Sequence, residues 1–251
     1  VGELMDTEVA GIAPTTPATE VANLFQDRDL VSAAVVAPDD GRLLGRITID
    51  DVVDVIRDEA EHSVISMAGL DEYADMFAPV VHSARRRGVW LGVNLVTAFV
   101  AASVVGQFEA TIQQIVALAI LMPIVASMGG VAATQTLTLI VRGIALGQVE
   151  RANARWLFTK ELSVAMLNGC IAALIVASVA FAWFRNWRIA AVIFAAMVVN
   201  LVAAALAGVS VPLALKRFGV DPAVAGGVIV TTVTDVTGFA SLLGLGTLLL
   251  R

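Results

Sequence analysis

The sequence of 251 residues is 58% hydrophobic and 15% charged, and it carries a net charge of −6. This composition is too apolar for an ordinary soluble domain. The charges are also segregated, because residues 1–82 contain 17 acidic and 4 basic side chains whereas residues 84–251 contain 5 acidic and 12 basic ones. We therefore predict two domains that lie in different solvents, an acidic cytoplasmic head and an apolar body.

The first 62 residues predict a small α/β domain. In chain order we expect a helix, two strands joined by a tight turn, and a second helix. These elements are residues 17–25, 30–37, 43–48 and 49 to about 61. Thr48 and Asp51 have the spacing of a capping box at the start of the second helix. Because about sixty residues bury little core, we expect this domain to pack against a partner or a further domain.

Residues 63–87 form a connector with a partly apolar face. A dense run of acidic residues extends from the preceding helix into this connector, between positions 50 and 75. Such runs are usually solvated surfaces. Beside a cation pathway the run could also bind divalent ions, and its candidate ligands are Asp58, Glu59, Glu61, Asp71 and Glu72.

Five apolar stretches in the rest of the chain are long enough to cross a membrane. They are residues 89–106, 112–141, 162–184, 189–215 and 223–250. Most of the basic residues between them fall on one side of the bilayer, together with the basic triplet at residues 85–87. This asymmetry places the N-terminus in the cytoplasm. We predict an α-helical, multi-pass protein of the inner membrane, with a transmembrane domain at residues 88–251.

The second apolar stretch is unusually long and contains Pro123 and the pair Gly129 and Gly130. As one helix it would extend roughly 45 Å, which exceeds the hydrocarbon core. We therefore expect a broken or strongly kinked helix. The glycines allow close approach either of another helix or of a hydrated ion, and residue types alone do not separate the two.

Asp235 lies about mid-way along the fifth stretch, where a carboxylate costs roughly 2.5–3.5 kcal/mol on insertion scales. Intramembrane acids usually face a water-filled path, so we predict that Asp235 meets the transported ion. The alternative is a protonated side chain that bonds to a neighbouring helix. Thr231 lies one turn earlier on the same face, and Thr232, Thr234 and Thr237 are close by. These oxygens suit a hard cation, although threonine hydroxyls commonly bond to their own helix.

Three asparagines lie inside apolar stretches, at Asn94, Asn168 and Asn200. We expect hydrogen bonds between helices from each of them rather than contact with an ion. The isolated His62 and His82 have no second ligand at the spacing of a zinc site.

Several motifs together resemble the MgtE family of magnesium channels. They are residues 121–130, 134–136 and 141–147 in the second stretch, and residues 219–223 and 234–238 at the fifth. Residues 43–51 look like part of the second CBS domain of such a protein. The resemblance covers nearly the whole chain, which corresponds to the part after the family's N-terminal helical domain and first CBS domain.

This resemblance implies a homodimer of five-helix subunits that imports Mg²⁺ and is not an enzyme. The pore would lie at the dimer interface and be lined by the second and fifth helices, and residues 63–87 would contain a connecting helix that acts as a plug. Asp235 matches the family's pore aspartate, and Thr231 matches the position whose backbone carbonyl faces the ion. Divalent cations at the acidic head would gate the pore. The expected partners are these cations, the lipid bilayer and a second copy of the chain. We expect no nucleic-acid partner.

Two other functions remain open. In the first, a divalent cation transporter is coupled to protons or sodium, and Asp235 carries the proton or pairs with the coupling ion. In the second, the protein is a membrane sensor regulated by its CBS domain, and it transports nothing itself.

Overall fold

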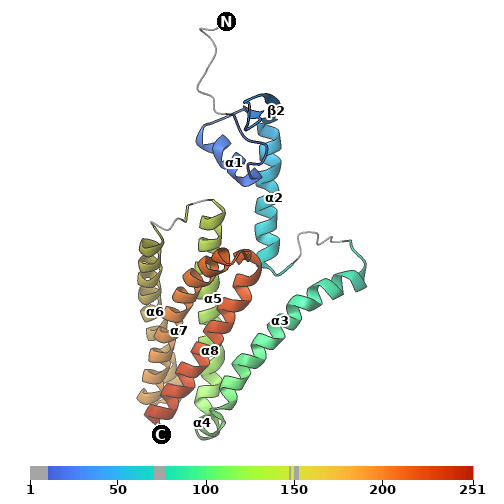
Figure 1. Ribbon diagram of the computed structural model, residues 1–251. Helices are drawn as coiled ribbons and strands as arrows, with labels where there is room; N and C mark the ends of the chain where they lie inside the picture. The colour runs from blue at the N-terminus through green and yellow to red at the C-terminus, as the bar shows by residue number, and fades with distance from the viewer. Residues whose placement is uncertain (1–10, 71–76, 147, 150–152, 251) are drawn as a thin grey trace. The chain divides into compact units, whose positions relative to one another are not determined.

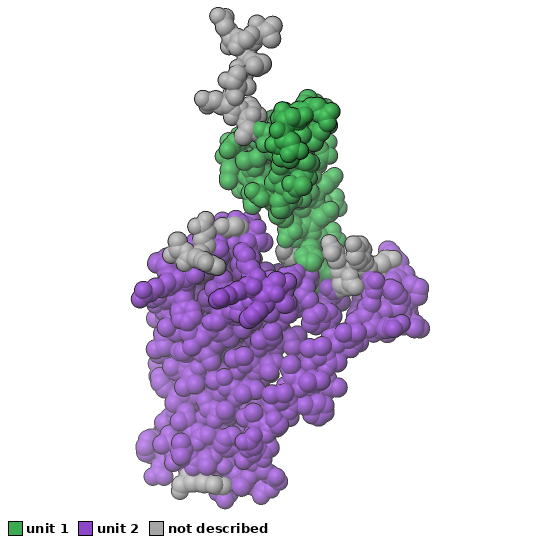
Figure 2. All heavy atoms as spheres, viewed as in Figure 1, with its two compact units in different colours: residues 1–65 green, residues 66–251 purple. Residues whose placement is uncertain are grey.

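The computed structural model describes residues 11–70, 77–146, 148–149 and 153–250, with only the backbone described at residue 63. Two compact units make up the chain, residues 1–65 and residues 66–251 (Figure 2). The predicted domain boundaries after residues 62 and 87 stay predictions.

The first unit contains two helices and one small sheet. In chain order its elements are α1 (Ala18–Asp27), β1 (Ser32–Val36), β2 (Leu43–Thr48) and the greater part of α2 (Ile49–Met67). The strands are antiparallel, with Ser32 opposite Thr48, and Ile12 adds an isolated parallel bridge to Val35. A small core joins the helices to the sheet; its buried members are Ile12, Val21, Ala22, Phe25, Ala33 and Val52. The predicted order of helix, strand, strand and helix is confirmed.

The start of α2 is fixed by the capping pair that the sequence indicates. One oxygen of the Asp51 carboxylate accepts hydrogen bonds from the backbone N–H of Thr48 at 2.9 Å and from the Thr48 hydroxyl at 2.8 Å. These two bonds lower the pKa of Asp51, with the backbone bond contributing most. The other end of α2 lies at Met67, beyond the predicted end near residue 61, because Gly69 is the first residue that adopts the left-handed conformation of a helix C-terminus, with φ 69°.

The second unit contains five helices that are long and apolar enough to cross a membrane. They are α3 (Val80–Gly106), α5 (Val116–Ala145), α6 (Ala154–Phe184), α7 (Trp187–Arg217) and α8 (Pro222–Leu250). All five predicted spans are present as helices. Each extends past its apolar stretch at one end or both, but α5 begins at Val116, inside the stretch at residues 112–141. The short helix α4 (Glu109–Gln114) precedes α5 and is joined to α8 by a hydrogen bond of 2.8 Å between the hydroxyls of Thr111 and Thr247.

Helix α7 is the centre of this bundle and α3 is its periphery. α7 packs against α5, α6 and α8, and half of its most apolar window is buried, against 6% for α3. Figure 1 shows α3 as the long green helix that leans away from the other four, and its main packing partner is α8. The outer surface of α3 is therefore available to lipid or to another chain.

The interruption in the second span differs from the prediction. α5 is a continuous helix through Pro123 and both glycines, so the second stretch is not broken at these residues. The other expectation, a strong kink there, stays a prediction. The chain breaks earlier, at Ile115, whose φ of −131° and ψ of 74° separate α4 from α5. Proline is tolerated inside membrane helices because neighbouring helices and local adjustments satisfy the freed backbone groups.

The connector expected at residues 63–87 is divided between two helices. Its first residues complete α2, and residues from Val80 onward belong to α3, which therefore starts well before its apolar stretch. Within the described part of this range no separate helix forms. Residues 71–76 lie outside the described residues.

Candidate functional site

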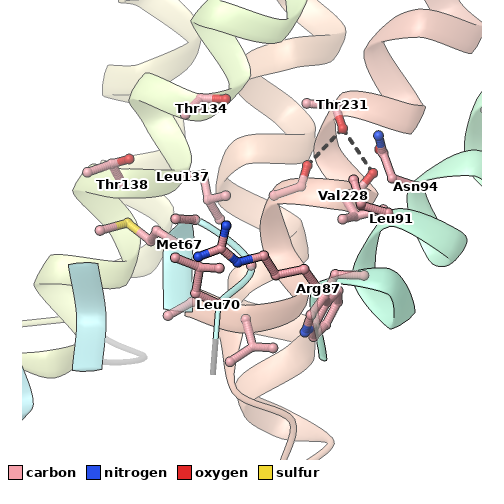
Figure 3. Close-up of a pocket in the computed structure, with 16 residues that line it drawn as sticks. Met67, Leu70, Arg87, Leu91, Asn94, Thr134, Leu137, Thr138, Val228 and Thr231 are labelled. Atoms are coloured by element: carbon pink, nitrogen blue, oxygen red, sulfur yellow. Dashed lines mark hydrogen bonds between the residues drawn. The ribbon is translucent and has the colours of Figure 1, made fainter. Parts of the chain in front are cut away.

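A cavity of about 500 Å³ lies between α3, α5 and α8 (Figure 3). Met67, the last residue of α2, and residues 68–70 after it form a further part of its wall. Its polar side chains come from all three helices; they are Arg87, Asn94, Thr134, Thr138 and Thr231. The cavity therefore combines the second and fifth predicted spans, and it includes residues of the expected connector.

The threonines of α8 direct their hydroxyl protons to their own helix. The Thr231 hydroxyl donates to the carbonyls of Gly227 at 2.9 Å and Val228 at 3.1 Å, as the dashed lines in Figure 3 show. Thr232 donates to Val228 at 2.6 Å, and Thr234 donates to the Thr231 carbonyl at 2.9 Å. Back-bonding, which the sequence left open, is confirmed for these three hydroxyls. With its proton used inside the helix, the Thr231 hydroxyl presents oxygen lone pairs to the cavity, and these accept from water or bind a cation.

Asp235 lies one helical turn beyond Thr231 on α8, and its side chain is partly buried. Among the described residues, none forms a hydrogen bond or an ion pair with this carboxylate. A carboxylate without a protein partner inside an apolar helix is stabilised by water, by a proton or by a cation. The structure thus places the two predicted pore residues in succession along one face of α8.

Arg87 brings a positive charge into the same cavity. Figure 3 shows its side chain extending from α3 toward Met67 and Leu70. Trp90, one turn later on α3, approaches the turn after α2, since a Cβ atom at Gly69 would lie 3.8 Å from its ring. The sequence indicated only a topological role for the arginine triplet at residues 85–87. Arg87 reaches the cavity because α3 already starts at Val80, which the sequence did not predict.

Asn200 of α7 bonds to α5 and packs against α8. Its side-chain amide is fully buried and donates a hydrogen bond of 2.8 Å to the carbonyl of Val125. Glycines on both sides make room for it, because a Cβ atom at Gly238 would lie 2.8 Å from the amide nitrogen and one at Gly129 would also collide with this side chain. The expected bond between helices is confirmed for Asn200. Gly129 therefore serves helix packing, whereas the space beside Gly130 is open.

The other two asparagines differ from the prediction. Asn94 and Asn168 are exposed, and each lines a cavity. Neither forms a hydrogen bond between helices within the described residues. Their amides remain available to water or to a ligand.

The candidate regulatory residues are not assembled into a site by the described structure. Asp58, Glu59 and Glu61 are exposed along α2, and Asp71 and Glu72 lie outside the described residues. Across the described ranges, no three histidine, cysteine, aspartate or glutamate side chains form a group that could hold a metal ion. The sensor therefore stays a prediction.

Glu161, which directly precedes the apolar stretch at residues 162–184, is buried. It lies inside α6, only 5% exposed, and accepts a hydrogen bond of 3.3 Å from the Thr136 hydroxyl. The Lys160 ammonium lies 3.2 Å from its other carboxylate oxygen. The only sequence feature that could have indicated this buried pair is a lysine next to a glutamate at the edge of an apolar stretch.

Comparison with known proteins gives two family matches and several relatives. Residues 122–245 match the MgtE family model, a divalent cation transporter, and residues 1–58 match the CBS domain. The magnesium transporter MgtE of Thermus thermophilus is 32% identical over 255 residues, which cover 100% of this chain and 56% of that protein. Those of Bacillus subtilis and Enterococcus faecalis are 29% and 28% identical, and the match covers 54% and 55% of their lengths. The chain thus spans about half the length of the curated relatives that it matches.

Proposed function

Because the chain belongs to the MgtE family of divalent cation transporters, we propose that it forms a pathway that carries Mg²⁺ across the membrane. The observation that carries this proposal is the position of Thr231 in a cavity that α5 also lines, with Asp235 one turn further along the same face of α8. Mg²⁺ sheds its water reluctantly and prefers oxygen ligands, so hydroxyl and carboxylate oxygens bind it through its hydration shell.

The complete pathway requires a second copy of the chain in this proposal. One subunit supplies a wall of α5 and α8, and the cavity beside it is not enclosed by protein on every side. A homodimer would place two Asp235 carboxylates across the path from each other. Two carboxylates offset the charge of one divalent ion, which makes its passage through an apolar environment less costly.

In the same proposal, the residues between α2 and the start of α3, together with Arg87, control the opening of the pathway. Arg87 and residues 67–70 line the cavity, and a guanidinium there repels an entering cation. At an effective dielectric of 20, two unit charges 4 Å apart interact by about 4 kcal/mol, and a divalent ion doubles this energy. Divalent cations on the acidic residues of the head would favour the arrangement in which Arg87 stays in the cavity. Regulation would then follow the internal Mg²⁺ concentration.

The test is Mg²⁺ uptake into proteoliposomes that contain the chain, with a fixed membrane potential and an internal magnesium-sensitive dye. We expect uptake that exceeds that of empty liposomes and does not depend on a pH or sodium gradient. Uptake that requires either gradient would replace the proposal by coupled transport. A folded protein that carries no divalent cation under any gradient would favour the membrane sensor.

A further inference from the structure

A second cavity, of about 340 Å³, lies between α5 and α6 and shares no lining residue with the first. Side chains of α5 and α6 line it, together with Leu201 and Ala205 of α7. Met128, Val131 and Gln135 of α5 face this cavity, whereas Thr134 and Thr138 face the first one. At 100° per residue Val131 and Thr138 lie on nearly the same side of α5, so the two sets are neighbours around the helix. The second cavity is a separate groove because none of its lining residues also lines the first cavity.

The polar end of this groove is a buried carboxylate with a replaceable partner. The Glu161 side chain is 6% exposed, whereas that of Lys160, which neutralises it at 3.2 Å, is 46% exposed. Thr136 satisfies the second carboxylate oxygen at 3.3 Å from within the protein. A half-exposed ammonium on a flexible stem can leave this carboxylate, but an unpaired buried carboxylate is costly. The position of the Lys160 ammonium thus marks where another ammonium group would bind.

The depth of these residues matches the profile of a lipid leaflet. α6 has 31 residues and extends about 46 Å, about 16 Å more than the ~30 Å hydrocarbon core. Glu161 lies about 10 Å from the start of α6, close to the boundary between headgroups and hydrocarbon. Val164, Ile171 and Ile175 continue the groove from there, and all three are exposed apolar side chains. From Glu161 to Ile175 is about 21 Å along the helix, which exceeds the ~15 Å of hydrocarbon in one leaflet.

We propose that the groove between α5 and α6 binds a phospholipid with a primary ammonium headgroup. The ammonium donates to the Glu161 carboxylate, and Lys160, released from that carboxylate, pairs with the lipid phosphate. One acyl chain lies along the exposed apolar side chains of α6. A quaternary ammonium has no N–H to donate, so a choline headgroup cannot replace the Lys160 ammonium at Glu161.

The test is native mass spectrometry of the purified chain with phosphatidylethanolamine or phosphatidylcholine that carry identical acyl chains. We expect several-fold greater retention of the ethanolamine lipid. Glu161→Gln, which keeps the size of the side chain and removes its charge, should lower that retention to the level of the choline lipid. Glu109→Gln is the matched control, because this exposed glutamate lies on α4, outside the groove. It should leave both lipids unchanged.

A second variant keeps the test decisive if Glu161→Gln does not fold. Val164 is 43% exposed in the groove, so Val164→Trp fills the groove without changing the core, and it should also lower retention of the ethanolamine lipid. Equal retention of the two lipids by the wild type would overturn the proposal, since binding would then be nonspecific. So would a Val164→Trp chain that loses its dimer but keeps its lipid, because the groove would then be a contact between subunits.

Discussion

At the scale of single residues, hydrogen bonding decides what each polar side chain offers to a ligand. Thr231 uses its hydroxyl proton inside α8 and presents an acceptor to the cavity, whereas Asp235 has no partner among the described residues. Asn200 is the opposite case, because its amide proton binds the Val125 carbonyl and serves the fold. Three polar residues in apolar helices thus have different roles, which their hydrogen-bond partners distinguish and their residue types do not.

The capping pair of α2 predicts a pH dependence. The folded-state pKa of Asp51 is lowered, so its stabilising contribution is fully present above the unfolded pKa, near 3.8, and is lost as the pH falls through the lower folded value. Hydrogen exchange of the full chain should show a protected Thr48 amide at pH 5 to 6, and this protection should decrease below about pH 4. In Asp51→Asn the protection should no longer change with pH over this range. A Thr48 amide equally protected at pH 2.5 and pH 6 in the wild type would contradict the assignment.

At the scale of helices and strands, hydropathy was sufficient to predict which elements exist and their order along the chain, but not the residues at which they begin and end. The five spans and both strands follow from apolar runs and alternation, which local sequence determines. The early start of α3 at Val80 could not be predicted from hydropathy, because charged residues extend a helix beyond the bilayer without an apolar signal. The break at Ile115 and the continuity through Pro123 depend on how neighbouring helices satisfy the backbone. The same limit applies to Glu161, whose burial depends on the packing of α5, α6 and α7.

Two glycines on adjacent helices give a matched prediction about packing. At Gly238 a Cβ atom would lie 2.8 Å from the Asn200 amide and 3.1 Å from Val125, so Gly238→Ala should force α8 away from α5 and α7. We expect a loss of about 1–3 kcal/mol in unfolding free energy, as for an overpacked core. Gly130→Ala meets open space and should be neutral, or stabilising by up to about 1 kcal/mol through helix propensity. Denaturant titration in detergent measures both. Equal effects of the two substitutions would contradict the packing assigned to Gly238.

At the scale of the whole molecule, the two cavities give α5 two different surfaces. One surface, with Thr134 and Thr138, faces the candidate pore, and the other faces the groove that Glu161 closes at its polar end. α7 supports both, since it packs against α5, α6 and α8. Motifs along the chain predict Thr231 and Asp235 as pore residues. The groove could not be predicted in this way, because it forms only where residues of three helices meet.

The position of Arg87 predicts how the connector controls flux. Arg87→Gln removes the positive charge from the cavity but keeps a polar side chain of similar length, so Mg²⁺ uptake at low external concentration should rise several-fold. Arg85→Gln is the control, because Arg85 is exposed and does not line the cavity. Parallel uptake assays on the two variants measure the difference. If both raise uptake equally, the effect is one of surface charge and the gating role of Arg87 is wrong.

The most direct test of the central proposal is Mg²⁺ uptake by the Asp235→Asn variant in proteoliposomes. Asparagine has nearly the same size, so the substitution removes the charge and leaves the packing of α8 intact. The proposal predicts that uptake falls by at least about tenfold, equivalent to about 1.4 kcal/mol, while Glu109→Gln on α4 transports like the wild type. Both variants should elute from gel filtration as the wild type does. Unchanged uptake by a folded Asp235→Asn protein would contradict the assignment of the ion path to this carboxylate.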